Sequence, residues 1–212
     1  MKTKKLPEWL YALIILIPFV YLAVIWQNLP AEVPLHFNYE GEVDRYGDKM
    51  QVLLIPILLP LLTYLILWAI PKIDPKKRIK EMGNKYDSLK FFLVISMSAL
   101  ACYIIFAIEK GSLNTNGLYI VIGVLVAGLG NYMQTIKPNY FIGVRTPWTL
   151  ENDIIWKKTH LLTGRLWIIG GILIIAISFL YSNIFSRSAF IVLILTISFV
   201  PILYSYLLYR KT

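Results

Sequence analysis

Hydrophobic residues along this chain gather in six long blocks separated by polar segments. The blocks run over about 9–27, 51–71, 91–108, 117–136, 166–182 and 189–209. An α-helix rises 1.5 Å per residue, so about 20 apolar residues cross the roughly 30 Å of hydrocarbon in a bilayer. The blocks are continuous and lack the alternation of barrel strands. We therefore predict an all-α membrane protein, a six-span transmembrane helix bundle that forms a single polytopic domain over residues 1–212.

The composition excludes a water-soluble globule of this length. Hydrophobic residues make up 58% of the 212 residues and charged residues only 16%, whereas a soluble domain carries about 25% charged residues. Cys102 is the single cysteine, so an internal disulfide is impossible.

The net charge of +9 comes from basic residues concentrated in alternate connections. If the N-terminus is inside, 17 of the 21 Lys and Arg residues lie inside: in the tail with Lys2, Lys4 and Lys5, the inner loops 72–90 and 137–165, and the C-terminal tail. Short cytoplasmic loops are enriched in basic residues in this way. We predict that both termini are cytoplasmic in a multi-pass protein of the cell membrane. Anionic lipids of the inner leaflet are then the expected partners of these loops, and no nucleic acid is required.

The spans carry no charged residue at their centres, which argues against a proton-coupled pump. Their most polar pair is Asn131 and Gln134, three residues apart on one helical face near the inner end of the fourth span. This pair either joins helices by hydrogen bonds or faces a substrate.

Glycine and proline predict how the spans pack. Glycines crowd the fourth and fifth spans, and small residues let helices approach closely in lipid, so these spans are expected to be tightly packed neighbours. Pro56 and Pro60 each remove a backbone donor from the second span, which is therefore predicted to be kinked.

The outer loop 28–50 has the alternation of a short extended strand. Apolar residues at 33, 35, 37 and 39 alternate with more polar ones, and Gly41 follows as a turn. Its acidic balance suits an exposed platform for a cationic peptide, and a structured cap over the bundle is the alternative. His36 supplies too few soft ligands for a zinc site. The candidate residues of this loop are His36, Asn38, Gly41 and Asp44.

The inner loop 137–165 contains a bend followed by a helical pattern. Gly143 and Pro147 bracket Arg145, whose guanidinium either clamps the loop or contacts a ligand. Thr149 is the expected cap of a helix that rests at the membrane interface. The candidate binding or output residues are Asn139, Gly143, Arg145, Thr146, Pro147, Trp148, Thr149, Trp156 and His160.

The sequence predicts neither an enzyme nor a cofactor or metal site. It contains no Gly-x-Ser-x-Gly elbow, no His-Glu-x-x-His pair and no Walker loop. His36 and His160 are predicted to lie on opposite sides of the membrane, so they cannot share a metal.

Two strings in these loops resemble a known family. The run Asn-Tyr-Phe-Ile-Gly-Val-Arg-Thr-Pro-Trp-Thr-Leu at 139–150, continued by Trp156 and His160, is similar to the signature of the SdpI family of bacterial membrane proteins. The string Pro-Leu-His-Phe-Asn at 34–38, with Gly41 and Asp44, resembles the N-terminal domain of unknown function common in that family.

The resemblance implies a six-span immunity protein that protects its producer against a secreted, membrane-active peptide toxin. The family is typified by the immunity protein against the sporulation-delaying toxin, which also signals by drawing a cytoplasmic transcriptional repressor to the membrane. A small-molecule or lipid transporter or channel is the alternative, motivated by the kinked second span and the glycine-rich spans.

Overall fold

The structure is a computed structural model that describes residues 6–75, 77–179 and 184–211. Lys2, Lys4 and Lys5 of the basic tail lie outside the described residues, as does Lys76. The last residues of the predicted span 166–182 fall there too.

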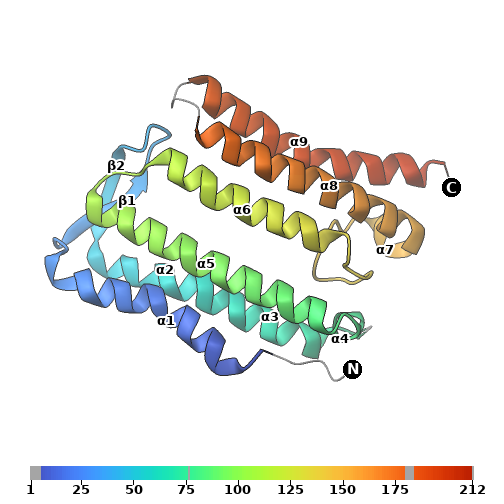
Figure 1. The fold of residues 1–212 in the computed structure, drawn as a ribbon, viewed down its shortest axis with the longest axis horizontal. Helices are drawn as coiled ribbons and strands as arrows, with labels where there is room; N and C mark the ends of the chain where they lie inside the picture. The colour runs from blue at the N-terminus through green and yellow to red at the C-terminus, as the bar shows by residue number, and fades with distance from the viewer. Residues whose placement is uncertain (1–5, 76, 180–183, 212) are drawn as a thin grey trace.

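Helices dominate the fold (Figure 1). The first half of the chain comprises α1 (Glu8–Ile25), η1 (Trp26–Asn28), β1 (Glu32–Phe37), β2 (Val43–Asp48), η2 (Lys49–Leu53), α2 (Leu54–Pro56), η3 (Ile57–Leu61), α3 (Leu62–Ile73), α4 (Arg78–Glu81) and α5 (Asn84–Lys110). The second half comprises α6 (Thr115–Met133), α7 (Pro147–Glu151), α8 (Asp153–Ser178) and α9 (Ile184–Tyr209).

The described residues form six helices that are long and apolar enough to cross a membrane, which confirms the predicted fold class. They cover Glu8–Asn28, Lys49–Ile73, Asn84–Lys110, Thr115–Met133, Asp153–Ser178 and Arg187–Tyr209. The first described residues and the C-terminal end of α9 lie at the same end of the bundle (Figure 1). We call this the basic end, because it also holds the connections 74–83 and 134–152, and we call the opposite end, with β1 and β2, the hairpin end.

The sides of the bundle expose large apolar side chains. Val24 is 72% exposed and Leu203 61% exposed, and similar residues occur on every long helix. A surface of this kind is stable only in contact with lipid. The chain is therefore a multi-pass membrane protein.

Helices α6 and α8 pack closely along a row of glycines, as predicted for the fourth and fifth spans. A Cβ atom on Gly130 would lie 2.8 Å from the carbonyl oxygen of Gly164. One on Gly171 would lie 2.5 Å from both the backbone nitrogen of Ala127 and the carbonyl oxygen of Gly123. Backbone therefore packs against backbone, which only residues this small allow.

The second span is not a regular α-helix. A 3₁₀ turn over Lys49–Leu53 passes into a short α segment, a π segment over Ile57–Leu61 and then α3. Pro56 ends the short α segment and Pro60 lies inside the π segment. The prolines interrupt the α-helical hydrogen bonds because neither has an N–H to donate.

The outer loop is a two-stranded hairpin rather than one strand. The predicted strand is β1, and Gly41, with φ +86°, lies in the turn as expected. The partner β2 was not predicted, because its sequence Val-Asp-Arg-Tyr-Gly-Asp is mostly polar and exposed. Backbone pairing with β1, rather than an apolar pattern, makes it a strand.

The predicted interface helix capped by Thr149 is wrong in two respects. Thr149 belongs to the short helix α7, where it closes a capping box with Thr146. The longer helix is capped by Asn152, whose side chain accepts the N–H groups of Ile154 and Ile155. That helix, α8, continues without a break through the fifth span, so its first turns extend a transmembrane helix instead of lying on the membrane surface.

Candidate functional site

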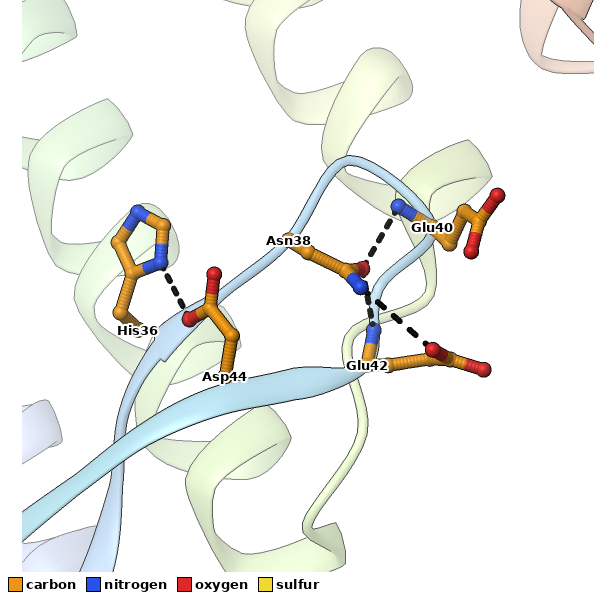
Figure 2. A network of polar contacts seen from close by, with 5 residues as sticks. All are labelled: His36, Asn38, Glu40, Glu42 and Asp44. Carbon is orange, nitrogen blue, oxygen red and sulfur yellow. Dashed lines mark hydrogen bonds and ion pairs between the residues drawn. The ribbon is translucent and has the colours of Figure 1, made fainter.

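An acidic β-hairpin caps the hairpin end of the bundle. Asn38 builds its turn, because Oδ1 accepts the backbone N–H groups of Glu40 at 2.8 Å and Glu42 at 3.0 Å (Figure 2). Its Nδ2 donates to a carboxylate oxygen of Glu42 at 3.5 Å. Asparagine commonly fixes turns by such side-chain to backbone bonds. The turn therefore holds Glu40 and Glu42 in defined positions.

His36 and Asp44 face each other across the two strands (Figure 2). Nδ1 of His36 lies 2.6 Å from Oδ1 of Asp44, and about half of each side chain is exposed. No group of three or more His, Cys, Asp or Glu side chains that could hold a metal occurs in the described part of the chain. The hairpin thus brings three predicted outer residues, His36, Asn38 and Asp44, onto one exposed surface.

The hairpin tip is fixed to the rest of the bundle by two contacts. The carbonyl of Gly41 accepts the N–H of Leu113 at 2.9 Å, and a Cβ on Gly41 would lie 2.0 Å from the Leu113 carbonyl oxygen. Arg187 of α9 lies 3.8 Å from the carboxylate of Glu40 and stacks 4.7 Å from the ring of Tyr39. The tip therefore joins the α5–α6 loop to the beginning of α9.

Three acidic side chains of the hairpin form no ion pair within the described part of the chain. Glu32 and Asp48 are directly opposite in the strand register, and both are exposed. Neither they nor Glu42 form an ion pair with any residue that the structure describes. Like charges placed opposite each other destabilise a strand pair, so this arrangement favours the approach of a cation.

An apolar cavity of about 430 Å³ opens beside the hairpin. It lies between β1, the start of the second span and the facing ends of α5 and α6. His36 and Arg45 are the titratable side chains of its lining. The rest of the lining is mainly aliphatic: Pro34, Leu35, Phe37, Gln51, Leu54, Ile55, Ile104, Ile108, Leu113 and Leu118.

At the basic end, Asn139 organises the segment that leads from α6 to α7. Its side chain is 2% exposed. Oδ1 accepts the N–H groups of Phe141 and Ile142, each at 2.8 Å, and Nδ2 donates to the carbonyls of Lys137 and Ile142. All hydrogen-bonding capacity of the amide is used within the loop, so Asn139 shapes the backbone and leaves little for a ligand.

Gly143, His160 and Trp156 form the next layer of this segment. The N–H of Val144 donates to Nε2 of His160 at 3.0 Å, and Nδ1 of the same ring lies 2.9 Å from the carbonyl of Trp156. His160 is therefore the neutral tautomer with its proton on Nδ1. A Cβ on Gly143, where φ is +113°, would lie 2.1 Å from Nε2, so only glycine fits. The Trp156 ring stacks on His160 and donates its indole N–H to the carbonyl of Ile136 at 2.8 Å.

Helix α7 is joined to α9 through Ser205. The indole N–H of Trp148 donates to Oγ of Ser205 at 2.6 Å, and Oγ of Thr146 lies 3.4 Å from the same atom. The Trp148 ring packs on Tyr206 and Tyr209. The predicted residues Thr146 and Trp148 therefore hold the end of α9 against α7. Thr149 bonds within the loop, to Thr146 and to the carbonyl of Val144, and Pro147 occupies the first helical position, where its missing N–H costs nothing.

Arg145 remains exposed, and its guanidinium donates to the carbonyl of Tyr140 in its own loop. This is the contact that the clamp alternative requires. A guanidinium has five N–H donors, so this one contact does not exhaust the capacity of Arg145.

The predicted pair Asn131 and Gln134 lies at the end of α6, and both residues are exposed. Gln134 lies against α8, since a Cβ on Gly164 would be 2.5 Å from its Cγ. Asn131 lines an open recess between α5 and α6. The two side chains therefore face different surroundings.

Sequence reasoning missed Lys90, which is buried in the second turn of α5. It is 6% exposed, and its Nζ lies 3.7 Å from Glu8 of α1 and 4.3 Å from the Tyr11 ring centre. Its position at the edge of an apolar block gave no sign of burial. A buried lysine inside a membrane protein is a functional candidate by default.

Comparisons with known proteins match one segment in each half of the chain. Residues 135–205 match the SdpI/YfhL protein family, and residues 13–59 match a domain of unknown function, DUF1648. The chain is 24% identical over 202 residues to the immunity protein SdpI of Bacillus subtilis (strain 168), and the alignment covers 94% of each chain. No solved structure matches. The predicted resemblance to the SdpI family is confirmed: the first family segment contains the Asn139–Leu150 string, and the second contains the hairpin.

Proposed function

We propose that this protein is an immunity protein that protects the cell against a secreted, membrane-active peptide toxin. The similarity to an immunity protein over nearly the whole chain supports an immunity role. The observation that carries the finer proposal is the hairpin, whose residues 28–50 include five acidic and two basic side chains. Membrane-active peptides are typically cationic and amphipathic. Glu32, Asp48 and Glu42, which form no ion pair among the described residues, offer charge to such a peptide, and the adjoining apolar cavity offers room for one of its apolar side chains.

The proposal has the hairpin outside the cell and the basic end in the cytoplasm. Its support is the distribution of charge, with 17 of 21 basic residues on the connections and tails assigned to the inside. The membrane is then the bacterial cell membrane. A recruited cytoplasmic repressor would meet the exposed guanidinium of Arg145, which lies within the hydrogen-bonded segment 139–149.

Protection of a toxin-sensitive host tests the immunity role. Cells expressing the protein are challenged with cationic peptide toxins, and their survival is compared with that of cells carrying an empty vector. We expect cells with the Glu32→Gln/Asp48→Asn double variant to survive only toxin doses at least about tenfold lower than cells with the wild type survive. The reason is that each of the two facing carboxylates contributes on the order of 1 kcal/mol to binding a cation near a membrane. Glu151→Gln, an exposed acid at the basic end, is the control and should protect like the wild type.

Absence of protection by the wild type at normal membrane levels would contradict the immunity role. Full protection by the double variant would contradict only the hairpin as the contact site. Arg145→Ala distinguishes signalling at the basic end from peptide binding at the hairpin, because it should reduce a signalling readout while the peptide still binds the hairpin.

Transport of a small molecule or lipid is the second candidate function. The helix Lys49–Ile73 lines the cavity beside the hairpin through Leu54 and Ile55, and it lines a second cavity at the basic end through Leu67 and Trp68. Between them its α-helical bonding is broken at Pro56–Pro60, and such interruptions occur in helices that gate transporters. Flux into liposomes containing the purified protein distinguishes this function from immunity.

A further inference from the structure

A cavity at the basic end has the chemistry of a phosphate site. It has a volume of about 530 Å³ and lies between the start of α1, the end of α3 and the first turns of α5. Three lysines line it, Lys72, Lys80 and Lys90, together with the carboxylates of Glu8 and Asp87. The elements that line it lie at the end of the bundle opposite the hairpin (Figure 1), so an inference about it does not depend on the proposed function.

Lys90 provides a fixed positive charge in the cavity wall. Its side chain is 8% exposed, and Glu8 at 3.7 Å and the rings of Tyr11 and Tyr64 hold it in place. The hydroxyl of Tyr64 donates to the other carboxylate oxygen of Glu8 at 2.5 Å. Glu8 is therefore engaged in contacts within the protein. Lys90 is held in place before any ligand binds, so binding does not have to order it.

Lys72 and Lys80 add charge that the protein does not neutralise. Both are exposed, and neither forms an ion pair with a carboxylate among the described residues. Lys72 lies over the ring of Trp68, an arrangement typical of the membrane interface, where tryptophan and lysine mark the headgroup level. The cavity thus opens where phospholipid headgroups lie, and its lining carries one more positive than negative charge.

We propose that this cavity binds the phosphate headgroup of an anionic glycerophospholipid. The phosphate is expected to lie between the ammonium groups of Lys72 and Lys80, with Lys90 behind them. The apolar lining residues Leu6, Pro71 and Ile79 suit the glycerol and the first acyl carbons. A basic pocket between transmembrane helices is a general way to hold such a headgroup.

Native mass spectrometry of the purified protein tests the proposal. The probes are phosphatidylglycerol, phosphatidylcholine and soluble glycerol phosphate, each titrated separately. We expect phosphatidylglycerol to bind at least about tenfold more tightly than phosphatidylcholine, and the Lys72→Gln/Lys80→Gln variant to lose that preference, since each lysine contributes on the order of 1 kcal/mol. Both side chains are exposed, so the variant should elute like the wild type in gel filtration.

Lys157→Gln/Lys158→Gln is the matched control. It removes two exposed lysines of α8 at the same end without touching the cavity. An equal loss in both double variants would overturn the proposal in favour of general attraction to negative charge. Equal binding of the two lipids would overturn it as well, and glycerol phosphate binding as tightly as phosphatidylglycerol would assign the site to a free phosphate compound instead.

Discussion

At the scale of single residues, the segment 139–149 is specified by hydrogen bonds that accept few alternatives. Asn139 uses every donor and acceptor of its amide, and His160 accepts the N–H of Val144 only in its neutral form. Gly143 is required because a Cβ would overlap the imidazole. These residues explain why the segment adopts one shape. Arg145 differs from them, because its side chain is exposed, and it is therefore the position where a partner contact is best sought.

Ser205→Ala tests whether α7 is held by a single hydroxyl. The substitution leaves the indole N–H of Trp148 without its acceptor at 2.6 Å. An unsatisfied donor away from water costs about 1–3 kcal/mol, so the free energy of unfolding should fall by that amount. Unfolding in mixed detergent and denaturant, followed by tryptophan fluorescence, measures it.

Ser178→Ala is the matched control for this experiment. Its Oγ donates at 2.6 Å to the carbonyl three residues earlier, as that of Ser205 does, but the structure gives it no partner in another element among the described residues. The loss should stay below about 1 kcal/mol. Equal losses for the two variants would show that the bond between Trp148 and Ser205 contributes nothing specific.

At the scale of elements, the sequence predicts the transmembrane helices, which the lipid environment requires, and misses elements that form only through contacts with distant parts of the chain. Long apolar blocks become helices because no other single-segment structure satisfies its backbone in hydrocarbon. β2 was missed because its polar sequence has no apolar alternation, and only its pairing with β1 makes it a strand. The start of α8 was misplaced because Asn152 and Thr149 are both plausible caps. Lys90 was missed because its burial depends on Glu8, which lies 82 residues earlier in the chain.

The close contact of α6 with α8 leads to a second prediction. In Gly171→Ala the new methyl group would lie 2.5 Å from backbone atoms of α6, so the helices must separate. Overpacking of this kind costs about 1–3 kcal/mol of unfolding free energy. Gly170→Ala is the control, because its methyl would meet the side chain of Ile197 at 2.9 Å, which can move. A larger loss for the control would contradict backbone contact as the reason for the glycines.

At the scale of the whole molecule, two groups of helices meet along α5 and α6. Phe92 of α5 packs on Gly128 and Tyr132 of α6 toward the basic end of this boundary. The hairpin tip joins the groups at one end, and at the other a cluster containing Ile79, Met82, Met133 and Trp156 does so. Gly41 of the hairpin tip lies in one segment that matches a family profile, and Arg187 and Trp156 lie in the other. A ligand that displaced the hairpin from Arg187 would loosen one of these connections, which is one way to couple the two sides of the membrane.

That coupling requires the two ends to face different compartments, and cysteine labelling tests this. Glu42→Cys, Lys80→Cys and Lys158→Cys each place one exposed thiol on the hairpin, near α4 and on α8, in a Cys102→Ser background. In intact cells a membrane-impermeant maleimide should label only Glu42→Cys, because basic loops are retained in the cytoplasm. The other two should react only after the membrane is opened. Labelling of Lys80→Cys and Lys158→Cys from opposite sides would contradict the six-span layout, and labelling of both from outside would reverse the orientation and place the hairpin away from any secreted peptide.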